Sequence, residues 1–276
     1  MMQRIIAHYR YSIILLRELV KTDFKLRYQG SILGMVWSVL KPLMLFAIMY
    51  VVFVRFLKFG ANVPHFVVSL LLAQTLWAFF QEATGQGMMA VVGRGDLLRK
   101  INFPRYIVVI SATVSAFINL AISLVVVAIF MAINGVPLSW KIILFPLVVS
   151  ELYILSVGVA LILSSMYVKF RDICHIWDVL VQMLFYLTPI IYPIGMIINM
   201  NGHSSLTIAK IILVSPIAQI IQDARYVLIG PTETVWSVVN GPFGLFKLAP
   251  LIIVALILTI GIVVFKRASR TFTEDL

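Results

Sequence analysis

The sequence contains six apolar segments, each long enough to cross a lipid bilayer as a helix. They lie at about residues 35–56, 66–92, 106–133, 142–168, 176–198 and 248–265. A helix needs about 20 apolar residues to span about 30 Å of hydrocarbon, and it satisfies its own backbone hydrogen bonds where water is absent. With 62% hydrophobic and 12% charged residues, the chain has more apolar side chain than a soluble core can bury. The sequence therefore predicts an all-α polytopic membrane protein with six transmembrane helices.

The lysines and arginines predict how these spans are oriented. With the N-terminus inside, the outer connections hold only Arg55, Lys58, Lys141, Lys210, Arg225 and Lys247. Apart from Lys41, the other cations cluster before residue 30, at 94–105, at 169–171 and after residue 265. Because Lys and Arg in short loops stay on the cytoplasmic side, we expect both termini in the cytoplasm. The same asymmetry accounts for the net charge of +11, so no nucleic-acid partner is expected.

Three segments do not fit a plain six-span arrangement. Residues 1–30 mix apolar and basic positions, which predicts an amphipathic helix in the cytoplasmic interface; a solvated basic tail is the alternative. Residues 91–105 are bracketed by glycines and a proline, which predicts a short surface helix. The external connection 199–247 is apolar but interrupted by prolines and glycines, which predicts re-entrant helices. Residues 31–276 otherwise form one six-span membrane domain.

No stretch of the sequence resembles the active site of a soluble enzyme. There is no phosphate-binding GxxxxGK[ST] loop, no HExxH and no G-x-S-x-G motif. The four histidines are scattered without metal-ligand spacing, and Cys174 is the single cysteine. We therefore expect no catalytic residue and no metal site in this chain.

Polar side chains in the second apolar segment are candidates for a pore or a subunit contact. Gln74, Gln81, Glu82 and Gln86 recur near one face of the expected helix. An ionisable group inside a span costs about 2.5–3.5 kcal/mol on insertion scales, so these residues should face away from lipid. A structural hydrogen bond inside the helix bundle explains them equally well.

Four short stretches, in order along the chain, carry a family resemblance. Residues 27–42 follow the pattern R-Y-x-x-S-x-L-G-x-x-W with a proline shortly after it. Residues 98–104 (LRKINFP), 170–172 (FRD) and 188–193 (TPIIYP) add three further matches. Together they resemble the permeases of type-two ABC exporters, particularly those that move lipid-linked O-antigen, capsule or wall teichoic acid polymers.

This resemblance implies a homodimeric channel in the bacterial cytoplasmic membrane that exports a lipid-linked cell-envelope polysaccharide. Two copies of a separate ABC ATPase subunit would bind ATP and Mg²⁺, so no cofactor is expected in this chain. Coupling to that subunit is expected through the loop at 91–105 and the step after the fourth span. The residues concerned are Leu97, Leu98, Arg99, Lys100, Ile101, Phe103, Arg171 and Asp172.

A sugar polymer has apolar ring faces and hydroxyl edges, so its path should offer aromatic planes and neutral polar groups. The candidates are Gln74, Trp77, Gln81, Glu82, Phe185, Tyr186 and Tyr192, although interfacial belts and packing also use aromatic residues. The pyrophosphate of a lipid carrier needs cations, and the entry motif offers Arg27, Tyr28 and Lys41 for it. Extension of Lys41 to the bilayer head groups is the alternative.

Two other functions remain open for a polytopic chain of this kind. A membrane-embedded enzyme acting on polyprenyl phosphates would show clustered acidic residues or histidines in its inner loops, where this sequence has only Asp96, Asp172 and Asp178, singly placed. An ion-coupled secondary carrier would show internal repeats or paired broken helices. Neither pattern is visible in the sequence.

Overall fold

The computed structural model describes residues 12–23, 25, 30, 34, 36–59, 63–100, 103–137, 139–198, 205–230 and 248–272. Residues 12–23 are helical and are called the N-terminal helix below. The other helices are α2 (Val36–Met49), η1 (Tyr50–Phe56), α3 (Phe66–Gly93), α4 (Gly95–Lys100), α5 (Tyr106–Ile133), η2 (Trp140–Leu144), α6 (Phe145–Lys169), α7 (Ile173–Leu187), α8 (Ile194–Ile198), α9 (Ser205–Val214), α10 (Pro216–Leu228) and α11 (Ala249–Ala268). The described residues contain no strand, and the predicted all-α class is confirmed.

Among the described residues, five helical stretches are long and apolar enough to cross a membrane. They are α2 continued by η1, then α3, α5, η2 continued by α6, and α11. The chain is therefore a multi-pass membrane protein, as the apolar segments predict. A sixth apolar helix, α7, is shorter, with 15 residues.

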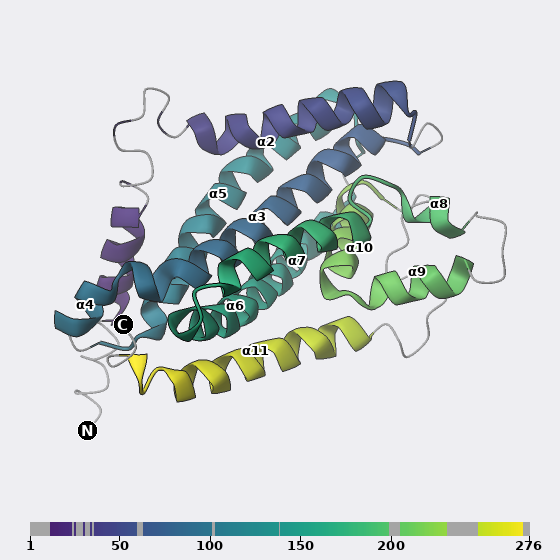
Figure 1. Ribbon diagram of the computed structural model, residues 1–276. Helices are drawn as coiled ribbons and strands as arrows, with labels where there is room; N and C mark the ends of the chain where they lie inside the picture. Colours follow the sequence, from purple (N-terminus) through teal and green to yellow (C-terminus); the bar gives the residue numbers. More distant parts are fainter. Residues whose placement is uncertain are drawn as a thin grey trace.

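Helix α3 lies at the centre of the bundle, and α2 lies at its edge. α3 packs against α5 and α6, and α6 packs in turn against α11 (Figure 1). Within the apolar stretch of α3, 78% of the residues are buried inside the protein, against 6% for the stretch formed by α2 and η1. The polar and aromatic side chains of α3 therefore meet protein, whereas the apolar side chains of α2 are left for lipid or another chain.

The basic connections gather at one end of the bundle, which we call the basic end. The N-terminal helix, α4 and the C-terminal end of α11 all lie there, with the turns that join α3 to α5 and α6 to α7 (Figure 1). The helices α8, α9 and α10 lie at the opposite end (Figure 1). The first and the last described residues therefore lie at the same end of the bundle, as the distribution of Lys and Arg predicts.

The fifth apolar segment differs from the expectation of one helix over 176–198. Helix α7 ends at Leu187, and Thr188 is extended with ψ 136°. Proline disfavours the helical conformation in the residue before it and has no N–H to donate, so Pro189 accounts for the end of α7. The chain turns through Pro193 and resumes as the five-residue α8. At 1.5 Å per residue, α7 is about 22 Å long, shorter than the hydrocarbon core of about 30 Å.

The connection between α8 and α11 contains a sharply bent helix pair. Its described part consists of α9 and α10, which meet at 98° across Ser215. Pro216 stands at the first turn of α10, where its missing N–H costs nothing, and it prevents α9 from continuing. Such a pair forms either a re-entrant loop or a broken span, and residues 231–247 of the expected re-entrant region lie outside the described residues.

The N-terminal helix lies against the bundle at the basic end. Its Leu15, Leu16 and Leu19 pack on a cluster that we call the basal cluster, whereas Ile13 and Ile14 are exposed. The basal cluster consists of Val91, Leu98, Phe103, Ile107, Val108, Val109, Val157, Ala160, Leu161, Val168, Phe265 and Phe272. The helical part of the predicted 1–30 interface segment is therefore amphipathic, with one apolar face held by protein.

Helices α6 and α11 approach each other so closely that only glycine fits at the contact. A Cβ added at Gly261 would lie 2.5 Å from the carbonyl oxygen of Gly158, and one added at Gly158 would lie 2.9 Å from the Cα of Leu258. The obstructing atoms belong to the backbone, which cannot rotate away. Small residues commonly allow such approach between membrane helices.

We predict that Gly261→Ala lowers the stability of the purified protein by about 1–3 kcal/mol, because the added methyl group overpacks this contact. Gly85→Ala in α3 is the matched control, since its Cβ would meet no atom within 4 Å. Alanine favours the helix over glycine by up to about 1 kcal/mol, so the control should be neutral or stabilising. Thermal unfolding followed by fluorescence-detected size exclusion measures both, and equal midpoints for the two variants would contradict the proposed overpacking.

Candidate functional site

A cavity of about 650 Å³ lies between α2, α3 and α5. Its walls carry both apolar and polar side chains, and the polar ones come mainly from α3. The lining residues are Trp37, Ser38, Lys41, Pro42, Leu45, Gln74, Thr75, Ala78, Phe79, Gln81, Glu82, Gln86, Asn119, Leu120 and Ser123. The four polar residues that the sequence placed near one face of the second segment thus line one cavity together.

Glu82 is the acidic group of this cavity, and two amides hold it. Its Oε1 accepts a hydrogen bond from Gln86 Nε2 at 2.9 Å, one turn further along α3. The same oxygen accepts another from Asn119 Nδ2 at 2.7 Å, across the contact with α5. Hydrogen bonds to an ionised group are about twice as strong as those between neutral groups, so this arrangement offsets part of the cost of placing a carboxylate in a span. Asn119 was not singled out from the sequence, although an isolated asparagine in the third apolar segment is a usable signal.

Gln74 and Lys41 are the side chains of the cavity that can bind a ligand. Gln74 is only 6% exposed, and within the described structure its Oε1 has no hydrogen-bond partner. A buried carbonyl oxygen of this kind calls for a donor, such as a water molecule or a ligand hydroxyl. Lys41 adds an exposed ammonium from α2. The arrangement suits a ligand that has hydroxyl groups together with an anionic group.

The aromatic residues expected on the substrate path do not line this cavity. Trp77 is 4% exposed and packs against Phe80 and Phe185, with ring centroids 5.7 and 5.6 Å apart. Tyr186 is 63% exposed on α7, and Tyr192 donates its hydroxyl to the Leu187 carbonyl at 3.0 Å in the turn after that helix. The structure therefore brings Gln74, Gln81 and Glu82 together, and holds the four predicted aromatic residues apart from them.

The other predicted sites fall partly outside the described residues. Arg27 and Tyr28, expected near a lipid head group with Lys41, lie outside them, as does Ile101 of the expected coupling loop. Leu98 and Phe103 are each 7% exposed and belong to the basal cluster, and Leu97 packs against it. The remaining coupling candidates, Arg99, Lys100, Arg171 and Asp172, are exposed at the basic end.

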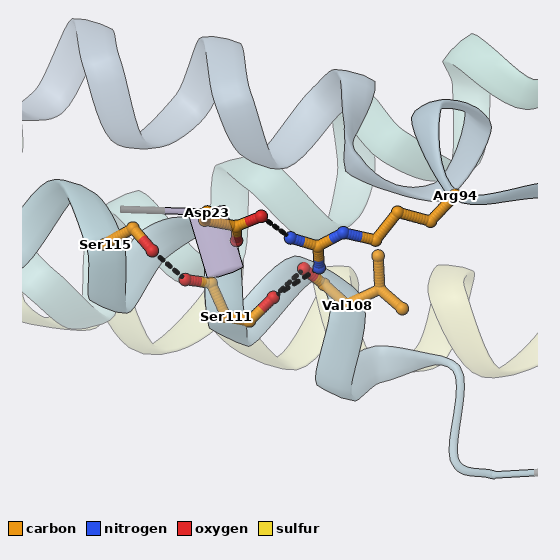
Figure 2. Close-up of polar contacts among 5 residues, drawn as sticks. All are labelled: Asp23, Arg94, Val108, Ser111 and Ser115. Atoms are coloured by element: carbon orange, nitrogen blue, oxygen red, sulfur yellow. Dashed lines mark hydrogen bonds and ion pairs between the residues drawn. The ribbon is translucent and has the colours of Figure 1, made fainter. Parts of the chain in front are cut away.

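A polar contact ties three elements together at the basic end (Figure 2). Arg94, the residue after α3, forms an ion pair with Asp23 of the N-terminal helix. Its Nη1 also donates to Ser111 Oγ on α5 at 2.6 Å, and Ser111 donates onward to the Val108 carbonyl at 2.9 Å (Figure 2). We call Asp23, Arg94 and Ser111 the basal joint. Side-chain exposures of 18% and 24% for Arg94 and Asp23 keep solvent screening of the pair incomplete.

Apart from a cation at position 94, nothing in the sequence indicates the basal joint. Asp23 and Arg94 are 71 residues apart, and Arg94 and Ser111 are 17 apart. No periodic pattern connects residues at such separations, so only the folded chain shows that they meet.

Comparison with known proteins places this architecture in a family. The family model for the ABC-2 type transporter matches residues 14–228. The chain belongs to the ABC-2 type transporter family. The matched region of this transporter contains the whole cavity and the basal joint, and it ends at the last residue of α10.

Curated relatives of the transporter are permeases of export systems. The chain is 31% identical over 193 residues to the O-antigen export system permease protein RfbA of Myxococcus xanthus, covering 69% of this chain and 72% of that protein. It is also 26% and 24% identical over 269 residues to two proteins of the same name from Klebsiella pneumoniae. Each of those matches covers 96% of both chains.

We predict that Asn119→Asp destabilises the transporter by about 1–3 kcal/mol, because it replaces an amide donor to Glu82 with a second carboxylate. Adding Glu82→Gln should restore most of the lost stability, since the amide and the carboxylate then exchange places across the same contact. The coupling is read as the difference in unfolding midpoint between the single and double variants. Additive effects of the two substitutions would show that the contact between α3 and α5 carries no such interaction.

Proposed function

We propose that this chain is the transmembrane subunit of an ATP-driven exporter that moves a lipid-linked cell-envelope polysaccharide, of O-antigen, capsule or wall teichoic acid type, across the bacterial cytoplasmic membrane. The observation that carries the proposal is the match over 96% of the chain to permeases named for O-antigen export. Membership of the ABC-2 transporter family supports it. The cavity chemistry is in keeping with such a substrate.

The cavity offers separate partners for the two chemical parts of a lipid-linked sugar. The amides of Gln74, Gln81 and Gln86 supply neutral donors and acceptors for hydroxyl groups. Lys41 supplies a cation for the pyrophosphate of the lipid carrier. Because Lys41 is in the second turn of α2, this cation stands near the end of the span where the chain enters the membrane. A polymer that carries the lipid at one end would present both groups to this cavity.

Energy would come from a partner subunit bound at the basic end. The sequence has no phosphate-binding loop of its own, so ATP and Mg²⁺ belong to a separate ABC ATPase. We propose that two permease chains and two ATPase subunits form the exporter, with the basic end in the cytoplasm. The exposed Arg99, Lys100 and Arg171 provide a cationic surface for that partner. The apolar outer faces of α2 and α7 are available for lipid and for the second permease chain.

We predict that Lys41→Ala raises, by about tenfold or more, the concentration of polyprenyl pyrophosphate needed for half-maximal stimulation of ATP hydrolysis by the reconstituted exporter. The reason is that a hydrogen bond to a charged group contributes about 1.5–3 kcal/mol. Lys41→Arg should retain much of the stimulation. Lys210→Ala, an exposed cation on α9 at the opposite end, is the matched control. If Lys41→Ala behaves as Lys210→Ala does, Lys41 is an anchor to the bilayer head groups instead of a substrate contact.

A second prediction concerns coupling to the ATPase. Asp23→Arg and Arg94→Asp should each lower the amount of polymer exported per ATP hydrolysed, because each breaks the link between the N-terminal helix and the turn that joins α3 to α4. The double substitution reverses both charges and should recover export. Glu18→Arg, an equal change of charge on an exposed residue of the N-terminal helix outside the joint, should have little effect. Export and hydrolysis are measured together in vesicles, and failure of the double variant to recover while all the proteins remain folded would remove the basal joint from the coupling route.

A further inference from the structure

Arg225 of α10 is a buried cation whose hydrogen bonds all go to backbone carbonyls. It is 2% exposed. Its Nη1 donates to the Pro189 carbonyl at 2.8 Å, its Nη2 to the Ile190 carbonyl at 2.9 Å and its Nε to the Ser69 carbonyl at 3.4 Å. Two of these acceptors lie in the turn between α7 and α8, and the third lies in the first turn of α3. One side chain thus joins three elements that are far apart in the sequence.

The acceptors in the turn are carbonyls that the end of α7 leaves without helical partners. Helix α7 stops at Leu187, and prolines at 189 and 193 prevent the chain from resuming a helix before Ile194. Carbonyls released in this way inside a membrane protein must be covered by neighbouring groups or by water. The guanidinium group suits this task because its five N–H donors are arranged in a rigid planar fork. The break in the fifth segment therefore depends on a side chain from α10.

Other contacts close a ring around this interaction. Ile194 of α8 packs against Ala209 and Leu213 of α9, and α9 leads through the 98° bend into α10. These contacts form a closed circuit, which runs from Arg225 to the turn, then through α8 and α9 back to α10. We call residues 187–198 together with α9 and α10 the clamped segment; Leu187 is included because its carbonyl accepts a hydrogen bond from the Tyr192 hydroxyl at 3.0 Å. It occupies the end of the bundle opposite the basic end (Figure 1).

We infer that Arg225 makes the clamped segment move as one body during export, so that α10 and the turn after α7 stay together when the path opens at that end. The inference rests on the proposed transport function. Separating α10 from the turn would leave a buried cation and two buried carbonyls without hydrogen bonds. The free-energy cost of leaving buried charged and polar groups without partners is high. The bond to Ser69 is the longest of the three, and the hydrogen bond from Lys141 Nζ to the Tyr226 hydroxyl is only partly buried. The contacts of α10 outside the body, to α3 and η2 and also to α6 and α11, are the ones that change when the body moves.

Distances between spin labels test the inference with Arg225 in place. In a Cys174→Ser background, one label pair at Leu187 and Ile211 joins the end of α7 to α9 within the body. A second pair at Ile133 and Ile211 joins the end of α5 to the same helix. All three positions are at least 60% exposed and accept labels without disturbing the core. Labelled permease is mixed with an excess of unlabelled permease and the ATPase, so that pulsed electron paramagnetic resonance reads distances within one chain.

We expect the distance between positions 187 and 211 to be the same in nucleotide-free and vanadate-trapped exporter, and the distance between 133 and 211 to change. A change in the first distance would show that α10 and the turn separate, which overturns the inference. Two unchanged distances in an exporter whose hydrolysis is stimulated by substrate would also overturn it, because no body would then move. Lack of substrate stimulation in the parent protein would instead count against the proposed function.

Substitutions at Arg225 test the same point in the resting protein, where no substrate is needed. Arg225→Met should broaden the distribution of distances between 187 and 211 and lower export several-fold, with basal hydrolysis little changed. Arg225→Lys keeps the charge and part of the donor set. Its distance distribution should therefore be narrower than that of Arg225→Met, and its export should be higher. Lys141→Met, which removes the cation bound to Tyr226 at the same end, is the control and should leave that distribution narrow. An equally narrow distribution in Arg225→Met would show that packing alone holds the body together.

Discussion

The absence of water from the bilayer interior is the constraint on which the rest of this structure depends. Every polar group placed in a span has to find its partner inside the protein. The hydroxyl groups of the buried helices do so locally, as when Thr84 donates to the Phe80 carbonyl and Ser156 donates to the Leu152 carbonyl one turn earlier. Glu82 and Arg225 cannot be satisfied within their own turn alone. Glu82 takes one donor from α5, and Arg225 reaches carbonyls of two other elements. The hydrogen bonds of the charged groups therefore determine which helices are held together.

Helix α3 makes most of these contacts because, among the long helices that the structure describes, it alone is surrounded by protein for most of its length. One face carries Gln74 and Glu82 into the cavity beside α2 and α5. Another face packs Trp77 against Phe185 of α7. Its first turn accepts a bond from Arg225, and the residue after its last turn forms the ion pair of the basal joint. In the proposed exporter, α3 thus connects the surface that faces the ATPase with the cavity and with the clamped segment.

The local features of the fold could be predicted from the sequence, because each depends on residues close together in the chain. Apolar runs of about 20 residues mark the spans, and Pro189 and Pro216 mark where helices stop. The face shared by Gln74, Gln81, Glu82 and Gln86 follows from helical periodicity, and all four line one cavity. The aromatic candidates are predicted from side-chain chemistry alone, which does not indicate the direction in which each side chain points, and the structure holds them apart from the cavity. Helical periodicity gives the position of each side chain around its own helix, but it does not determine how a neighbouring helix is rotated about its axis.

What the sequence by itself determined is that this chain crosses a membrane several times as helices, with its cationic connections at one end. Those properties follow from composition and spacing, because the cost of burying charge and backbone in lipid applies to each segment separately. Only the tertiary structure decided which polar groups meet. Glu82 and Asn119 are 37 residues apart, Asp23 and Arg94 are 71 apart, and Arg225 reaches a carbonyl 156 residues away. Such pairs form because the helices pack in one particular arrangement, and the close approach of α6 to α11 at Gly158 and Gly261 helps to fix it.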